Sequence, residues 1–409
     1  MRRFWLVLSV AAAGAASATS AHADLFSGDQ LRGFIDLKTG VANREHSWLD
    51  DGYGKTSYSG DGGGFDGQVQ GDAMLIWRPH LTWTLDGFLS LQANSQLRPQ
   101  VDVVESYLSY RGEPTNGWRL SGRLGLFYPP VSLEHDGPGW TTTNTITPSA
   151  LNSWVGEEVK VAGAEATLRH RMGDQQISTT LALFGYNDTS GTLLYARGWA
   201  MDDVLAGASS RLALPDRPGV YQDYTRPTAE LDNRAGYYAR VEYKPSGPLT
   251  LDLLHYDNAG DRKSDTHSLT DWETQFTNIG LRAALGPDTR LLAQTLWGQT
   301  VWGQVTPMGY WGDVDFNASY VLVAHDFGRN TVAGRLDYFQ THDRSFVATD
   351  NNNEHGWAAT ADYQLHITPK MTLAFEGLYL DSNRPARAAT GTDPRQDQTV
   401  VQSKLHVGF

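Results

Sequence analysis

Polar and apolar residues alternate one by one over stretches of about ten residues, and this pattern recurs along most of the chain. One clear stretch is 81–93, in which Phe88 is the exception and one face carries Leu81, Trp83, Leu85, Gly87, Leu89, Leu91 and Ala93. Such alternation predicts β-strands, because successive side chains of a strand point to opposite faces. Strands of soluble proteins usually span about 5 or 6 residues, whereas a tilted strand needs about ten to cross a membrane. The length of the pattern therefore favours a transmembrane β-barrel.

The connections between these stretches alternate in length. Short segments rich in turn-forming residues lie at 78–80, 112–117, 172–175, 244–248, 286–288, 327–330 and 367–370. The connections between them are mostly longer and lie at 42–65, 94–100, 129–158, 187–234, 257–271, 299–315, 341–354 and 381–397. Short periplasmic turns opposite long external loops are typical of outer-membrane barrels. The sequence thus predicts an all-β, antiparallel, up-and-down barrel of about sixteen strands, formed by residues 24–409 as one domain.

Both ends of the chain predict export to that membrane. Arg2 and Arg3 precede an apolar run, 4–13, which is too short to span a bilayer and leads to Ala21-His22-Ala23. This arrangement predicts a cleaved signal peptide over 1–23. The last stretch, 401–409, alternates toward a terminal Phe409 and resembles the signal by which barrel-assembly machinery recognises outer-membrane proteins. We expect outer-membrane lipid and lipopolysaccharide as the surroundings of the barrel.

Composition excludes several other functions. The formal net charge is −13 and no basic patch is visible, so we expect no nucleic-acid partner. The chain has no cysteine and therefore no disulfide. No G-x-S-x-G or H-E-x-x-H motif places a nucleophile or a metal beside a base, so we expect no enzyme activity, cofactor or metal. The acidic, glycine-rich stretch 50–66 lacks calcium-loop spacing and is interpreted as a flexible loop.

The third long connection, 129–160, has the composition of a segment that enters the lumen. A barrel of this size is too wide for its own side chains to fill, so water occupies it unless something else does. Trp140, Leu151 and Trp154 favour burial, and Pro129-Pro130 stiffens the start of the segment. We expect this segment to fold inward and constrict the pore. The alternative is that it stays outside and packs on neighbouring loops.

The stretch 122–127, Gly-Arg-Leu-Gly-Leu-Phe, and the following 129–134, Pro-Pro-Val-Ser-Leu-Glu, resemble a known pattern. They are similar to the strand and the beginning of the constriction loop in porins of the phosphate-selective O/P type. The resemblance implies sixteen strands, a homotrimer and an arginine-lined constriction. The alanines at 162, 164 and 166, and at 359 and 361, would suit a flat contact between subunits.

Charged residues on the polar face of the strands identify the candidate pore lining. A guanidinium facing lipid costs about 2–4 kcal/mol, so strand arginines are expected to point inward. The candidate lumen residues on the strands are Arg119, Arg123, Arg169, Arg240, Arg282 and Arg335, and those on the loop are Glu134, Asp136, Glu157 and Glu158. A cationic wall opposite an acidic loop would create a transverse field that filters solutes. Alternatively, the charges pair into a static network that stiffens the wall.

The function expected from these features is a water-filled channel for passive diffusion of small hydrophilic solutes or anions. Two alternatives stay open. The first is a channel specific for phosphate, oligosaccharides or aromatic acids. The second is a receptor or adhesin that uses the barrel as an anchor, since the fourth long connection carries Tyr195, Trp199 and Tyr224.

Overall fold

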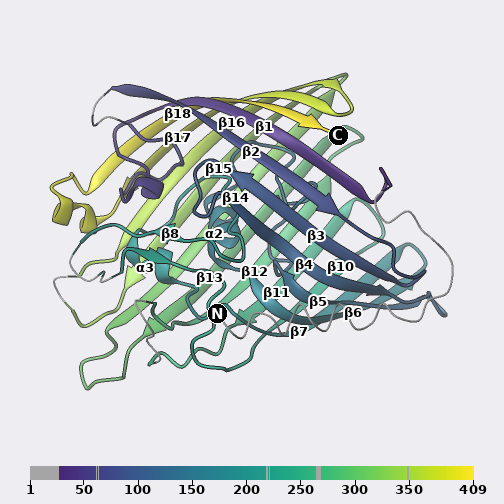
Figure 1. Ribbon diagram of the computed structural model, residues 1–409, viewed down its shortest axis with the longest axis horizontal. Coiled ribbons are helices and arrows are strands. Elements are labelled where there is room, and N and C mark those ends of the chain that lie inside the picture. Colours follow the sequence, from purple (N-terminus) through teal and green to yellow (C-terminus); the bar gives the residue numbers. More distant parts are fainter. Residues whose placement is uncertain are drawn as a thin grey trace.

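The computed structural model describes residues 27–409 except 61, 63, 218–219, 221, 264–268 and 348–349, so the predicted signal peptide lies outside the described residues. Within the described residues, sixteen antiparallel strands close into one barrel, as the sequence predicts (Figure 1). They are β1 (Leu31–Asn43), β2 (Phe65–Trp77), β3 (Leu85–Asn94), β4 (Val101–Arg111), β5 (Trp118–Phe127), β6 (Val161–Met172), β7 (Gln175–Gly185), β10 (Gly236–Lys244), β11 (Leu249–Asp257), β12 (Glu273–Ala284), β13 (Thr289–Trp302), β14 (Gly312–Phe327), β15 (Asn330–Asp343), β16 (Glu354–Thr368), β17 (Met371–Asn383) and β18 (Arg395–Gly408).

Each barrel strand pairs with its neighbours along the chain, and β1 pairs with β18 to close the ring. The connections contain short elements, which are the 3-10 helices η1 (Trp48–Asp50) and η2 (Pro385–Thr390), the helices α2 (Ala150–Glu158) and α3 (Thr192–Ala196), and a two-stranded sheet of β8 (Leu212–Ala213) and β9 (Tyr224–Thr225). Among the described residues, no helix combines the length and the apolar character needed to cross a membrane.

One strand boundary differs from the sequence pattern. The alternating stretch 81–93 predicts a strand from Leu81, but β3 begins at Leu85. The backbone N–H groups of Leu81 and Thr82 both donate to the carbonyl oxygen of Leu85, at 2.9 Å each. Residues 81–84 therefore form a turn. They continue the alternation of polar and apolar residues seen in β3, but they are not part of that strand.

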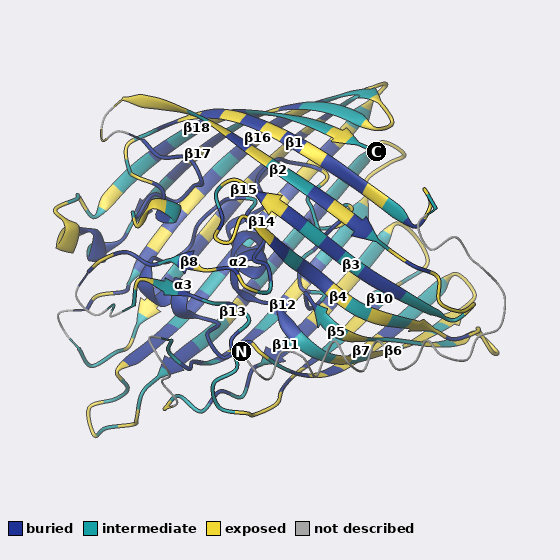
Figure 2. Cartoon of the chain, viewed as in Figure 1, coloured by how far each residue is buried: buried dark blue, intermediate teal, exposed yellow. Residues whose placement is uncertain are grey.

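The outer face of the barrel is apolar, as the alternation requires. Outward side chains such as Leu37, Leu120, Leu124 and Leu336 are each more than half exposed, and Figure 2 shows exposed and buried residues alternating along the strands. Arginines and carboxylates of the same strands lie at the alternate, inward positions. Closure satisfies every backbone hydrogen-bonding group that faces the hydrocarbon, which is the condition for a sheet to span a bilayer. This surface is that of a membrane-spanning barrel.

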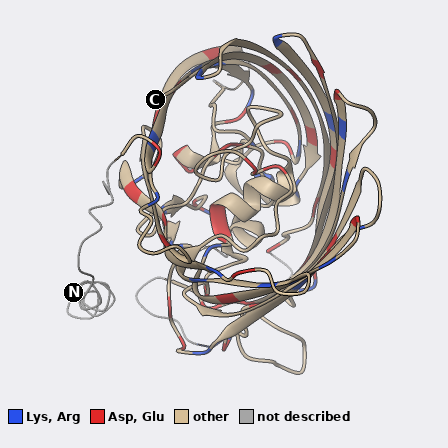
Figure 3. Ribbon diagram, turned by 90° about the vertical axis from the view of Figure 1, so that its right-hand side faces the viewer, with Lys and Arg blue, Asp and Glu red and all other residues tan. Residues whose placement is uncertain are grey.

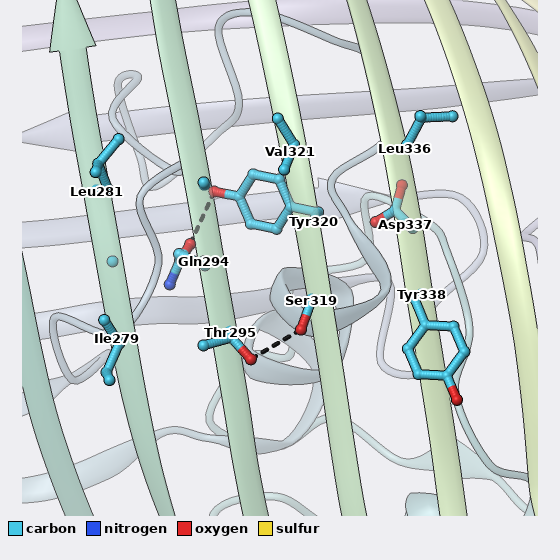
Figure 4. Close-up of a pocket in the computed structure, with 12 residues that line it drawn as sticks. Ile279, Leu281, Gln294, Thr295, Ser319, Tyr320, Val321, Leu336, Asp337 and Tyr338 are labelled. Carbon is cyan, nitrogen blue, oxygen red and sulfur yellow. Dashed lines mark hydrogen bonds between the residues drawn. The ribbon is translucent and has the colours of Figure 1, made fainter.

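One cavity, of about 420 Å³, lies in this outer wall rather than in the lumen (Figure 4). Small outward residues, Ala293, Thr295 and Ser319, form its floor between bulkier side chains of the neighbouring strands. The hydroxyl groups of Thr295 and Ser319 share a hydrogen bond of 2.8 Å, which satisfies both on an apolar surface. The cavity opens toward the membrane and is not part of a solute pathway.

The interior is not a simple water-filled tube. Parts of the third long loop (128–160, hereafter loop 3) and of the fourth (186–235, loop 4) run inside the ring of strands, which Figure 3 shows from the end that carries the short turns. They pack on inward side chains that are apolar, among them Leu254, Phe276 and Phe316. Within β14, the stretch 320–324 is apolar on both faces. Its outward face meets lipid, and inward residues of β14 such as Phe316 and Ala318 pack against the loops.

Candidate pore constriction

Loop 3 crosses the lumen and contacts strands in different parts of the wall. The Leu133 N–H donates to Gln294 of β13 at 2.9 Å, and on the nearly opposite side of the ring Gly139 lies directly against Met74 of β2. Further along the loop, the Ile146 N–H of the returning segment donates to Glu376 of β17 at 2.8 Å. Gly139 has φ +66°, and its lack of a side chain permits its close approach to Met74.

Arg335 of β15 holds loop 3 against the wall. Its Nε donates to Asp337 at 2.8 Å, and one terminal nitrogen donates to Glu134 of loop 3 at 3.1 Å. The two terminal nitrogens also donate to four further oxygens, those of Thr145, Thr147, Pro148 and Thr360. All three charged side chains are at most 4% exposed. The buried guanidinium therefore fixes loop 3 to the barrel wall through hydrogen bonds, and it does not line the pore.

Glu134 also organises the start of α2. Its carboxylate accepts the Ser149 N–H at 3.0 Å and the Asn152 side-chain amide at 2.6 Å. Ser149 is the N-cap of α2, and its hydroxyl accepts from the Asn152 N–H. Every residue of α2 is buried, since one side meets the barrel wall and the other meets loop 4.

The two remaining glutamates of α2 connect loop 3 to loop 4. Glu157 pairs with Arg197, whose guanidinium lies 4.1 Å from the ring centre of Trp48. Glu158 accepts the Gly191 and Leu193 N–H groups at 3.0 and 2.9 Å, which caps α3. Burial raises the pKa of Glu158 to about 7. The sequence analysis expected both glutamates on the pore surface, but the structure buries them completely between the loops, because loop 4 also enters the barrel.

Loop 4 is the functional segment that sequence reasoning missed. Leu193, Leu194 and Trp199 are fully buried inside the barrel. Lys38 of β1 joins the wall to loop 4 through Asp203 at 2.8 Å. The signal was present in the apolar stretches at 193–196, 199–201 and 204–206, which are as unsuited to a solvated loop as the apolar residues of 129–160.

The remaining predicted arginines differ in how they are paired. Arg123 binds Glu165 through two hydrogen bonds of 3.0 and 2.9 Å. Arg240 binds Asp252 and Glu242. Arg282 donates weakly to the carbonyl oxygen of Leu133 at 3.4 Å. Most of these inward charges therefore have partners on the wall itself.

Arg119 and Arg169 are different. They lie directly opposite each other on β5 and β6, on the inner face near the short turns. Within the described part of the chain, neither reaches a carboxylate, and the Nε atom of Arg119 has no hydrogen-bond partner. Like charges placed directly opposite destabilise a sheet unless something compensates them. Of the loop acids, Asp136 alone is exposed, and it accepts the Thr143 hydroxyl at 2.6 Å.

A narrow cavity of about 50 Å³ lies where the tip of loop 3 faces β1–β3. Its lining mixes charged, aromatic and hydroxyl groups, among them Asp36, Asp72, Lys404, His135, Trp140 and Thr142. A volume of this size has room for only a few waters. Its position between the loop tip and the wall makes it the candidate constriction.

Acidification is expected to loosen the tip of loop 3. His135 stacks on Trp140 at 3.8 Å, and burial lowers the pKa of His135 to about 3 from 6.5. The folded state therefore binds fewer protons between these values, so stability is complete above pH 6.5 and decreases as the pH falls below it. At pH 5 the cost should reach about 1–2 kcal/mol.

Urea unfolding of the wild type and of His135→Phe, measured at pH 7.5 and pH 5, tests this expectation. Phenylalanine keeps the stacked ring but binds no proton, so the variant should lose less stability on acidification. Equal losses in both proteins would show that the imidazole binds its proton as readily in the folded state as in the unfolded state, and would contradict this expectation.

Comparisons with known proteins rest on structure alone, because neither the protein-family models nor the curated proteins contain a match. The anion-selective porin from Comamonas acidovorans aligns over 93% of this chain and 98% of its own, at 15% identity and a TM-score of 0.53. The outer membrane channel DcaP of Acinetobacter baumannii aligns over 94% and 99%, at 11% identity and a TM-score of 0.56. OprB of Pseudomonas putida aligns over 96% and 100%, at 11% identity and a TM-score of 0.51.

The chain has the fold of outer-membrane porins. Together with the apolar outer face, this fold makes it a multi-pass β-barrel of the bacterial outer membrane. The likeness extends to the sixteen strands and does not single out the phosphate-selective type that the motif at 122–134 resembles.

Proposed function

We propose that the protein is a narrow diffusion channel that favours small anions. The observation that carries this proposal is the pair Arg119 and Arg169, two opposed guanidiniums on the inner wall without a carboxylate among the described residues. Hydroxyl groups of Ser121 and Thr167 occupy the next inward positions on the same two strands. Guanidinium and hydroxyl groups both donate hydrogen bonds, which an anion can accept.

Neighbouring positions extend the cationic character of this part of the wall. Arg111 of β4 lies opposite Ser121, and Arg171 is the next inward residue after Arg169 on β6. The chain as a whole is strongly acidic, with a net charge of −13, so this concentration of arginines is local. A local field of this kind raises the concentration of oppositely charged solutes in a confined lumen.

The proposal also covers the size of the permeant solutes. Loops 3 and 4 share one buried apolar core with the wall, and the cavity at the tip of loop 3 holds about 50 Å³. Small ions fit such a passage better than oligosaccharides do, and the proposed anion preference comes from the arginines of β5 and β6, because this cavity itself is lined by Asp36, Asp72 and Asp203 as well as by Lys404. Phosphate is one such small anion, and the resemblance at 122–134 supports its inclusion.

Reversal potentials in a planar bilayer with a potassium chloride gradient test the proposal. We expect an anion preference in the wild type. The double change Arg119→Ala and Arg169→Ala should reduce the chloride-to-potassium permeability ratio about two- to fivefold, because a unit charge at 4 Å in water is worth about 1 kcal/mol before salt screening.

Arg329→Ala is the matched control, since this exposed arginine lies in the short turn between β14 and β15 and not on the inner wall. It should leave the ratio unchanged. A wild-type preference for cations, or equal ratios in the double variant and the wild type, would contradict the proposal. Titration with phosphate and with neutral sugars then separates a phosphate-specific channel from a general one.

One observation favours a second candidate, a receptor or adhesin with a closed lumen. The two loops are held by apolar packing and by buried ion pairs, such as those between Arg335 and Glu134 and between Arg197 and Glu157, rather than by a few surface contacts. Absence of conductance from a correctly folded barrel would favour this reading over the channel.

We also propose that the barrel assembles as a homotrimer. The outward residues Ala162, Ala164 and Ala166 of β6 form a row of small side chains, and Ala166 lies opposite Gly122 of β5, which suits a flat contact between subunits. Light scattering of the detergent-extracted protein would give the mass of the assembly, and a monomeric mass would reject the trimer.

A further inference from the structure

Three carboxylates meet where the two ends of loop 4 come together. Asp188 stands at the start of the loop, and Glu230 and Asp232 stand near its end. The Asp188 N–H donates to the Ala229 carbonyl at 3.2 Å, which joins the two ends. One oxygen of each carboxylate lies within 4.8 Å of the others. The cluster is on the external side of the barrel, outside the strands.

Backbone groups fix the orientation of these side chains. The Leu231 N–H donates to Asp188, and the Tyr186 N–H donates to Glu230 at 2.9 Å. These bonds leave further lone pairs on each carboxylate, because an ionised carboxylate has about four acceptor sites. One oxygen of Asp232 is buried without a hydrogen-bond partner, and its nearest cation is the Nε atom of Arg234 at 3.8 Å.

A fourth carboxylate provides an independent observation. Asp271, at the end of the fifth long loop (258–272), is completely buried, and its Oδ1 atom has no hydrogen-bond partner. The next residue, Trp272, donates its N–H to the Asp188 carbonyl at 2.7 Å, which brings Asp271 beside the cluster. The Oδ2 atom of Asp271 accepts the Asp261 N–H at 3.3 Å, but a buried carboxylate with its other oxygen unpartnered, next to three further carboxylates, is costly unless a cation compensates it.

The electrostatics of the four groups agree with this geometry. Burial raises the pKa of Asp188 to about 7, and the charges of Glu230 and Asp232 add to that effect. Burial raises the pKa of Asp271 to about 8, with further contributions from Asp232 and Asp188. The carboxylates repel one another in this arrangement.

We propose that Asp188, Glu230 and Asp232, with Asp271 beside them, bind one calcium ion that ties both ends of loop 4 to the fifth loop. Calcium takes 6–8 oxygen ligands at about 2.3–2.6 Å, so two ligands on opposite sides lie up to about 5 Å apart. The spread of the three oxygens, within 4.8 Å, agrees with that limit. Backbone carbonyls and water would complete the shell. The ion would hold loop 4 in the mouth of the barrel.

Calorimetric titration of calcium chloride into the folded, lipopolysaccharide-free barrel tests this site. We expect binding of one ion with a Kd of about 0.1–1 mM, the range of extracellular calcium modules. Asp232→Asn should weaken binding at least about tenfold, since it removes a ligand charge. Asp216→Asn is the matched control, because Asp216 is an exposed acid of the same loop outside the cluster.

A second measurement keeps the test decisive. Terbium, which also prefers oxygen ligands, should give sensitised emission, because Trp272 adjoins the site, and calcium should displace it. Glu230→Gln serves in place of Asp232→Asn if the latter does not fold, as judged by heat-modifiable gel mobility. Absence of binding to the wild type, or equal affinities of the wild type and a folded cluster variant, would overturn the proposal.

Discussion

Replacing Arg335 with alanine is expected to lower the free energy of unfolding by about 3–5 kcal/mol, the usual cost of removing one partner from a buried ion pair. The guanidinium is 2% exposed and donates to Asp337 and Glu134 as well as to four neutral oxygens. Its loss leaves two buried carboxylates without a cation. Arg335→Lys should recover only part of this loss, because an ammonium has three donors and cannot reach the same oxygens.

Urea unfolding of the lipid-reconstituted barrel, followed by tryptophan fluorescence, measures this effect. Arg395→Ala is the control, because Arg395 pairs with Asp381 of the neighbouring strand at 2.8 Å, its side chain is 72% exposed, and its side-chain hydrogen bonds go to that carboxylate and not to loop 3. That change should leave the free energy of unfolding nearly unchanged, because exposed ion pairs contribute little to stability. Equal losses for Arg335→Ala and Arg395→Ala would mean that apolar packing alone holds loop 3 in the barrel.

The barrel could be predicted from the sequence because the period of a strand and the length needed to cross a membrane are both local properties. Leu336 and Arg335 show this. Because neighbouring side chains of a strand point to opposite faces, the leucine faces lipid and the arginine faces the interior. The positions of the turns and loops at the two ends of the barrel could be predicted because turn-forming residues recur between the strands. The inward position of loop 3 was expected because the large aromatic side chains of Trp140 and Trp154 favour burial over contact with water.

The pairing of the inward charges could not be predicted in the same way. Alternation gives the face of Arg335, but not which of the loop carboxylates reaches it across 201 residues of sequence. Arg119 and Arg335 are indistinguishable by pattern, yet one faces a neighbouring arginine and the other is enclosed by loop 3. Whether an inward residue is buried depends on which loops cover it. The conformation of those loops is set by contacts between segments that are distant in the sequence.

Loop 4 makes the same point. Apolar inward residues such as Leu254 and Phe316 depart from the expected polar lumen when each strand is considered alone. They are explained by the segments that cover them, α2 and the stretch around Trp199. The apolar residues of the strands and those of the loops are both visible in the sequence. Only the three-dimensional structure shows that they pack against each other.

Removing loop 4 is expected to increase single-channel conductance several-fold. Residues 189–228 can be deleted and replaced with two glycines, because Asp188 and Ala229 are already joined by a backbone hydrogen bond of 3.2 Å. The deletion removes α3, β8 and β9, and with them Leu193, Leu194 and Trp199 from the interior. Water should fill that volume and widen the path for ions.

The result would be specific to loop 4, because Arg335 continues to hold loop 3 in place. Shortening the sixth long loop (303–311) is the control, since Val305 and Met308 there are 70% and 73% exposed and do not enter the barrel. That change should leave the conductance as it is. If the loop 4 deletion folds but its conductance stays at the wild-type level, loop 3 alone sets the constriction, and combining the deletion with Arg335→Ala should then open the channel. If even that combination conducts no ions in a folded barrel, the lumen is closed by other means and the receptor reading replaces the channel.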